Sequence, residues 1–175
     1  FGHWWFEGPK FIENLFRCMN ETEILKPITP KAFIDDSLTS VQITTPADST
    51  WGANGYNEVW INGSNDWIYP HLDEMAERMT RLANDFYDET DPVKIRALQQ
   101  AMRELLLAQS SDWAFIMSTG TTVAYAVNRT KQHIVRFNEL FEALYKGQID
   151  EKCLEHYEWI DGIFSDPDYR LYAVR

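Results

Sequence analysis

The sequence of 175 residues is poor in the side chains that build metal centres and disulfide frameworks. It has four histidines, scattered along the chain, and two cysteines, Cys18 and Cys153. No HxxxH or CxxC pair places two ligands on one face of a helix, so we expect no bound metal. Two distant cysteines form no disulfide framework, and reduced thiols are typical of the cytoplasm, where we expect this protein.

Basic residues are also scarce. Lys and Arg together number 16 against 27 Asp and Glu, which gives a net charge of −11. Nucleic acids and anionic membranes are bound through basic patches, so we expect neither as a partner. No apolar run is long enough to span a bilayer. Neutral polymers stay open as partners.

The common motifs for nucleotides and activated nucleophiles are missing. No GxSxG elbow occurs, and the GANG segment at residues 52–55 lacks the spacing and the lysine of a phosphate-binding loop, so we expect no cofactor. Carboxylates are plentiful, and glycoside chemistry needs two of them across a cleft. The acids embedded among aromatic residues are Glu7, Glu58, Asp66 and Asp112. Each also fits a local role, and for Asp112 a helix cap stands beside any site role.

Aromatic residues, in contrast, make up 14% of the chain, with seven tryptophans, which indicates a site or an interface. Trp51, Trp60 and Trp67 fall within residues 50–71, where recurring Gly and Asn predict a loop. An indole ring stacks on the apolar face of a pyranose, and Asn or Asp bonds its hydroxyls. From these residues alone two interpretations are equal: a wall of a sugar-binding cleft, or an Ω-loop whose tryptophans cap a helical core.

Apolar residues recur every three or four positions along most of the chain, as on the buried face of an amphipathic helix. Prolines, capping side chains and glycines set the helix limits. The sequence predicts helices over residues 9–20 and 31–36, from a cap at Asn65 or Asp66 to about residue 87, and from residues 90–92 to the interruption at Ser110. Further helices are predicted at 113–117, from Thr121 or Thr122 to Gly147, and from Asp150 to Trp159. Their apolar faces should form the core.

One short strand or extended arm is predicted at residues 41–45, where apolar residues alternate before Pro46. No internal repeat or linker interrupts the chain. We therefore expect a mainly α fold: a bundle-like helical domain with irregular, tryptophan-rich loops towards its N-terminus.

Three segments carry a resemblance to a known family. They are FGHWWFEGP at residues 1–9, STWGANGYNEVWINGSNDWIYPHL at residues 49–72, and LLLAQSSDWAFIMSTGTTVAYAVNRTKQHIVRFNELFEAL at residues 105–144. In this order they resemble the C-terminal part of the 1,4-α-glucan branching enzymes of glycoside hydrolase family 57. The resemblance implies a helical domain that packs on the active-site face of a distorted (β/α)7 barrel.

The resemblance also implies an activity in glycogen biosynthesis. Such hexosyltransferases move α-1,4-glucan segments with retention and form α-1,6 branches, using a Glu nucleophile and an Asp general acid. Both carboxylates lie before Phe1 in that family, the acid directly ahead of FGHWW, and the chain looks like a piece of a longer protein. We therefore expect no catalytic residue in this chain, and no activity from it alone.

Carried over position by position, the resemblance implies substrate-binding roles. Trp51 matches a cleft tryptophan that stacks on the glucan, and Trp60 is a second stacking surface on the same loop. Asp112, in SSDWAF, matches a substrate-contacting acid. The segment that lines the cleft beside the missing general acid supplies His3, Trp4 and Trp5. Trp67, at the mouth of a helix, keeps a structural role.

The implied organisation assigns residues 1–8 to the end of the barrel region and residues 9–175 to the helical domain, with the cleft loop at 50–71. The implied partners are α-1,4-glucan (amylose or a glycogen-like polymer) and the N-terminal catalytic barrel of the same protein. Two alternatives stay open. One is a 4-α-glucanotransferase or amylase of the same family, and the other is a non-catalytic helical module that binds sugar or another protein.

Overall fold

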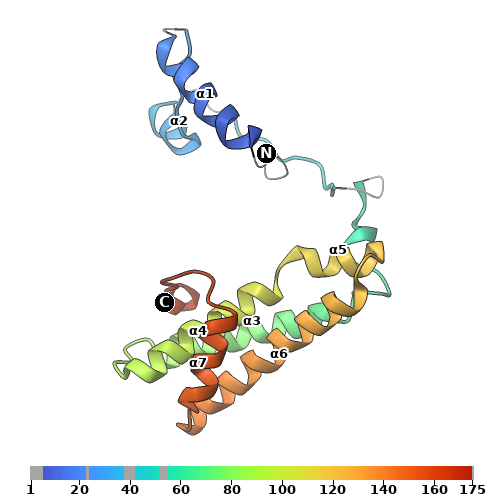
Figure 1. The fold of residues 1–175 in the computed structure, drawn as a ribbon, viewed down its shortest axis with the longest axis vertical. Coiled ribbons are helices and arrows are strands. Elements are labelled where there is room, and N and C mark those ends of the chain that lie inside the picture. The colour runs from blue at the N-terminus through green and yellow to red at the C-terminus, as the bar shows by residue number, and fades with distance from the viewer. Residues whose placement is uncertain (1–5, 23, 38–41, 52–54, 175) are drawn as a thin grey trace. The chain divides into compact units, whose positions relative to one another are not determined.

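The computed structural model describes residues 6–22, 24–37, 42–51 and 55–174, in two units, Phe1–Ala47 and Asp48–Arg175. Unit 1 holds α1 (Glu7–Glu21) and α2 (Pro30–Ser37). Unit 2 holds, in chain order, η2 (Asn57–Val59), α3 (Ile68–Asp85), α4 (Pro92–Ala108), α5 (Ser111–Thr119), α6 (Val123–Lys146), α7 (Glu151–Ile160) and η3 (Tyr169–Tyr172) (Figure 1). The described ranges contain no strand, and the prediction of a mainly α fold is confirmed.

Unit 1 consists of two amphipathic helices whose apolar faces are exposed. Both agree with predicted ranges, and α2 starts where Thr29 Oγ1 accepts a hydrogen bond from Ala32 N at 3.1 Å. Their apolar side chains, predicted to be core, instead stay 37–53% exposed: Phe11, Ile12, Leu15, Phe16, Phe33 and Ile34. Two short helices supply too little apolar surface to cover one another.

Of the two predictions for residues 41–45, a strand or an extended arm, the strand is wrong for the residues that the structure describes. Residues 42–50 adopt no regular secondary structure, and Ile43 is 99% exposed. Val41 lies outside the described residues. A strand needs a neighbouring strand to complete its ladder of hydrogen bonds, and the described segments supply none. Alternating apolar residues alone therefore leave this arm extended and solvated.

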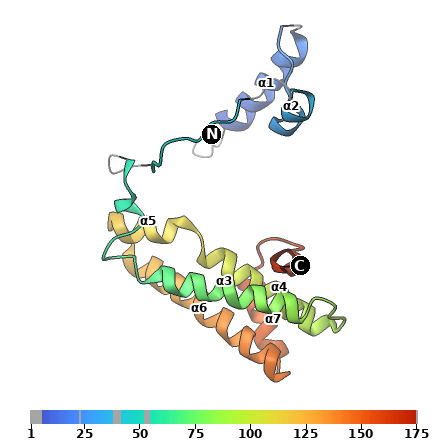
Figure 2. The same cartoon turned by 180° about the vertical axis from the view of Figure 1, so that it is seen from behind.

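Unit 2 is a bundle in which α4 packs against both α3 and α6. The three helices run side by side in both views, with α4 antiparallel to the other two (Figure 2). Their facing stripes bury a core of side chains that are at most 2% exposed: Met75, Met79, Leu82, Leu98, Leu105, Phe137 and Leu144. α7 packs on α4, and η3 packs on α3 and α4. None of the described helices combines the length and apolar content of a membrane span.

Most helix limits in unit 2 follow the predicted signals. Asp91 Oδ1 accepts a hydrogen bond from Val93 N at 2.9 Å, and Asp150 caps α7 in the same manner. Gly120 and Gly147 end α5 and α6 with φ of 79° and 66°, in the left-handed region that glycine favours. The predicted cap of α3 is wrong, because this helix begins after Trp67 with no side-chain cap bond.

Candidate functional site

Three aromatic rings gather where η2 meets α5, and two of them come from the tryptophan-rich segment. The ring centroids lie 6.2 Å apart for Trp51 and Trp60, 5.7 Å for Trp51 and Phe115, and 5.9 Å for Trp60 and Phe115. Trp51 is 69% exposed, whereas Trp60 and Phe115 are half-buried. These three residues are called the aromatic platform below. An exposed indole resting on two supported rings offers a free face on which a flat apolar partner stacks.

Phe115 is the platform member that sequence reasoning missed. It follows Asp112 by three positions on α5, and this spacing puts both side chains on one face of the helix. The SSDWAF motif therefore contained enough information to predict that Phe115 lies on the same face of the helix as Asp112. Only the fold shows that this face of α5 meets Trp51.

Two asparagines fasten the tryptophan-rich segment to α5. Asn65 is fully buried, and its Nδ2 donates to the backbone oxygens of Val59 at 3.2 Å and Ala114 at 3.1 Å. Asn62 Nδ2 donates to Ser118 Oγ at 3.0 Å, one turn further along α5. These bonds tie loop and helix together at two points, and each contributes about 1 kcal/mol. The platform is therefore a supported surface. Asn65 Oδ1, the atom that would cap α3, accepts instead from Asn62 N at 2.8 Å.

The rest of the segment closes on itself around the platform. Thr50 N donates to Gly55 O at 2.9 Å, and Thr50 Oγ1 donates to Tyr56 O. The hydroxyl of Tyr69 donates to Trp60 O, and burial raises the pKa of Tyr69. A polar hollow of about 380 Å³ opens on the same segment; its lining includes Asp48, Thr50 and Tyr56. Hydroxyl and carboxylate groups thus lie on the chain segment that carries Trp51, as sugar recognition requires.

Asp112 is exposed in the first turn of α5. Ser110 Oγ donates to its Oδ2 at 3.0 Å, and Ser110 itself occupies the N-cap position without a side-chain cap bond. The carboxylate therefore faces solvent one helical turn from Phe115, where it can accept hydrogen bonds from hydroxyl groups. Trp67 differs from these site residues. It packs against both apolar clusters of unit 2, in agreement with its predicted structural role.

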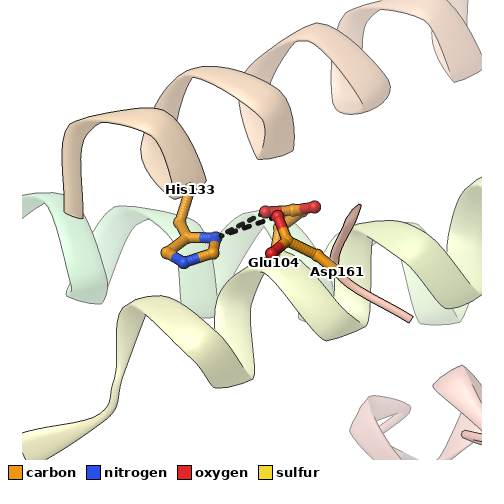
Figure 3. Close-up of side chains that lie close together, drawn as sticks. All are labelled: Glu104, His133 and Asp161. Carbon is orange, nitrogen blue, oxygen red and sulfur yellow. Dashed lines mark hydrogen bonds and ion pairs between the residues drawn. The ribbon is translucent and has the colours of Figure 1, made fainter. Parts of the chain in front are cut away.

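A second cluster, of buried polar side chains, lies inside the bundle (Figure 3). His133 Nδ1 is 2.7 Å from Glu104 Oε2 and 3.8 Å from Asp161 Oδ2. His133 and Glu104 are fully buried, and Asp161 is 5% exposed. Gln100 Nε2 donates to Glu104 Oε1 at 2.8 Å. These four residues of α4, α6 and the end of α7 are called the buried polar cluster.

The buried polar cluster has the spacing of a metal site, since ligand atoms of Glu104, His133 and Asp161 lie within 4.8 Å of one another. Its charges favour a different arrangement. Arg129 Nη2 lies 2.9 Å from Asp161 Oδ1, and Arg136 Nη1 contacts Asp161 Oδ2. Both guanidinium groups would repel a divalent cation. The geometry is that of a hydrogen-bonded ion-pair cluster.

The comparisons with known proteins decide the family. A family model described as the C-terminal region of 1,4-alpha-glucan branching enzymes matches residues 71–172. The chain belongs to this family. The match runs from α3 to η3 and therefore includes α5, which carries Asp112 and Phe115.

Individual relatives extend this result. The 1,4-alpha-glucan branching enzyme of Thermococcus kodakarensis is 32% identical over 168 residues, which cover 94% of this chain and 25% of that enzyme. The crystal structure of a GH57 branching enzyme from this archaeon, in complex with glucose and additives, gives a TM-score of 0.74 at 30% identity, covering 100% of this chain and 32% of that one. The alpha-amylase AmyC of Thermotoga maritima gives a TM-score of 0.67 at 51% identity, with coverage of 100% and 32%.

This branching-enzyme domain spans a quarter to a third of the length of those relatives. Among the predicted site residues, the fold brings Trp51 and Trp60 together against the helix that carries Asp112. His3, Trp4 and Trp5 lie outside the described residues, and their assignment to the cleft stays a prediction. The boundary predicted at residue 8 stays a prediction as well.

Proposed function

We propose that the aromatic platform and Asp112 bind α-1,4-glucan in a branching enzyme of glycoside hydrolase family 57 whose catalytic carboxylates lie outside this chain. One observation carries the proposal: the exposed ring of Trp51 rests on Trp60 and Phe115, and the exposed Asp112 precedes Phe115 by one turn of α5. A neutral polysaccharide also suits a chain with a net charge of −11.

The platform would act on the fate of the glycosyl-enzyme intermediate. In a retaining mechanism this intermediate is attacked either by water or by a sugar hydroxyl. A branching enzyme must favour the 6-hydroxyl of a second glucan segment. Stacking on Trp51 and hydrogen bonds to Asp112 hold that segment in place and reduce the access of water. Transfer then exceeds hydrolysis.

The proposal assigns a catalytic barrel of the same protein as the partner of this domain. The exposed apolar faces of α1 and α2 support it, because contiguous apolar surface of this kind is uncommon on free monomers and indicates an interaction surface. The cytoplasm is the proposed location and glycogen biosynthesis the proposed process. Both cysteines are free thiols, as in cytoplasmic proteins.

Replacing Trp51 by Ala in the full-length enzyme tests the proposal. We expect the ratio of branching to hydrolysis to fall about fivefold, because that factor corresponds to roughly 1 kcal/mol of lost stacking. Branching is measured by iodine staining and by chain lengths after debranching, and hydrolysis by reducing ends. Trp159→Ala is the matched control, because Trp159 is an 82% exposed tryptophan on α7. An unchanged ratio in Trp51→Ala would refute the proposal.

A second candidate function is hydrolysis of α-glucan as an amylase. It is favoured by the 51% identity with AmyC, which is described as an alpha-amylase. Debranching the product separates the two. From amylose, a branching enzyme yields short chains only after debranching, whereas an amylase yields them directly and forms no α-1,6 linkages.

A further inference from the structure

Only one of the two ring nitrogens of His133 has a hydrogen-bond partner among the described residues of the bundle. Its Nδ1 is paired with Glu104 Oε2, whereas its Nε2 is buried and has no hydrogen-bond partner. A buried polar atom without a partner costs free energy and calls for a reason. Because a carboxylate can only accept, the Glu104 bond places a proton on Nδ1. Nε2 is then an unpaired acceptor, which costs less than a buried, charged donor.

Charged side chains surround the Glu104–His133 pair. Arg129 and Arg136 both pair with Asp161, whereas Glu104 contacts His133 and Gln100. Arg103 closes the other side of the cluster. Its Nη1 donates to Gln100 Oε1 at 3.1 Å and its Nε to Ile163 O at 2.9 Å, and burial lowers its pKa. Arg103 thus holds Gln100, Gln100 holds Glu104, and Glu104 holds the His133 ring.

The fixed ring faces the helix that carries the site. The centroids of His133 and Trp113 lie 6.3 Å apart with the ring planes 33° apart. Trp113 Nε1 donates to Leu107 O at 2.7 Å, and its other edge meets Tyr125 with centroids 6.0 Å apart. Trp113 is thus held between two rings and the end of α4. It directly follows Asp112 and precedes Phe115 by two positions, so its placement orients the first turn of α5.

We propose that His133, held by Glu104, is a positioning residue that keeps Trp113 and the first turn of α5 in place, and thereby sets Asp112 and Phe115 against the glucan. It deepens the proposed function and rests on it. His133 touches no substrate, since it is fully buried. The feature that carries the proposal is the juxtaposition of the Glu104–His133 pair with Trp113.

Hydrogen exchange of the full-length enzyme tests the positioning without any assay of activity. His133→Phe keeps the ring and removes the donor to Glu104. We expect amide exchange at residues 113–117 to accelerate about tenfold, the factor for loss of one buried hydrogen bond. Glu104→Gln keeps an oxygen that accepts from Nδ1 but turns its NH2 group towards Gln100 Nε2, so exchange in α5 should accelerate less than in His133→Phe. Leu144→Ala opens a cavity at the far end of α6, and should not accelerate amide exchange in α5 more than elsewhere in the bundle.

A merely structural role gives a different pattern of exchange. If His133→Phe affects α5 no more than Leu144→Ala does, or if Glu104→Gln accelerates α5 as much as His133→Phe, the positioning role is refuted. The hydrogen-exchange experiment tests the positioning role even if the wild-type enzyme makes no branches. That outcome would refute the proposed function alone.

The second arm uses the ratio of branching to hydrolysis, at a temperature far below the unfolding transition of every variant. His133→Phe should lower the ratio several-fold, and Leu144→Ala should leave it unchanged. In the Asp112→Asn background, His133→Phe should lower the ratio less than it does in the wild type, because part of its effect acts through that carboxylate. Additive losses, or an equal loss in Leu144→Ala, would overturn the proposal.

Discussion

Units 1 and 2 are built from the same kind of amphipathic helix but differ in what covers the apolar face. In α1 and α2 the apolar side chains are a third to a half exposed, whereas their counterparts in α3, α4 and α6 are buried against one another. A three-to-four spacing therefore predicts that a helix forms and which face is apolar. It does not say whether the covering layer lies in the same chain.

Truncating one phenylalanine in each unit gives the largest expected contrast. Phe137→Ala removes a fully buried ring from unit 2 and should lower the free energy of unfolding by about 3–5 kcal/mol. Phe16→Ala removes a ring that is 53% exposed in unit 1 and should cost roughly 1 kcal/mol or less. Urea denaturation of the 175-residue chain measures both. Equal losses would show that the face of α1 is covered in this chain.

Asn65 provides a test of intermediate size within unit 2. Asn65→Ala leaves the oxygens of Val59 and Ala114 without this donor, and should lower stability by about 2–3 kcal/mol. It should also loosen the platform, which near-ultraviolet circular dichroism of the tryptophans reports. Asn57→Ala, an exposed change in η2, is the control and should alter neither signal. If the Asn65→Ala variant is as stable as this control, the hydrogen bonds of Asn65 do not hold the tryptophan-rich segment on α5.

The smallest expected effect is a pH dependence at the turn between α3 and α4. Hydrogen bonds from Asp91 N, Lys94 Nζ and Thr90 N hold the pKa of Glu89 at about 2, below its ordinary value of 4.5. The unfolded chain therefore binds more protons between these values, so stability falls as the pH drops from 4.5 towards 2. Melting temperatures across this range should fall less steeply for Glu89→Gln.

The matched control for this titration lies in unit 1. Glu13 pairs with Arg17 one turn along α1, where both side chains are exposed, and such pairs contribute little. Glu13→Gln should therefore leave the pH profile of melting as in the wild type. A profile flattened as much by Glu13→Gln as by Glu89→Gln would remove the distinction between the two units.

Local signals predicted the parts of the fold that depend on neighbouring residues. Asp91, Asp150, Gly120 and Gly147 all act at the helix ends where the sequence placed them, because caps and left-handed glycines need only a few adjacent residues. For residues 41–45 the sequence left a strand and an extended arm open, because strand pairing depends on a distant partner that local signals do not report.

The candidate site shows the same division. Trp51, Trp60 and Asp112 were predicted from family motifs, and their role in binding stays a prediction. Phe115 became apparent only from the contact between α5 and the tryptophan-rich segment. His133 looked like one of several scattered histidines. Its pairing with Glu104 spans 29 positions of sequence, and periodicity carries no information about such a contact.

The hydrogen bonds of Asn62 and Asn65 to α5 also affect when the aromatic platform can form during folding. The bonds from Asn65 to Ala114 and from Asn62 to Ser118 join groups separated by 49 and 56 positions. Contacts of such separation form after the local helices, because the loop-closure entropy must be offset first. We therefore expect the aromatic platform to form late in folding. A glucan that stacks on it, as proposed, would bind only chains in which the bundle is complete.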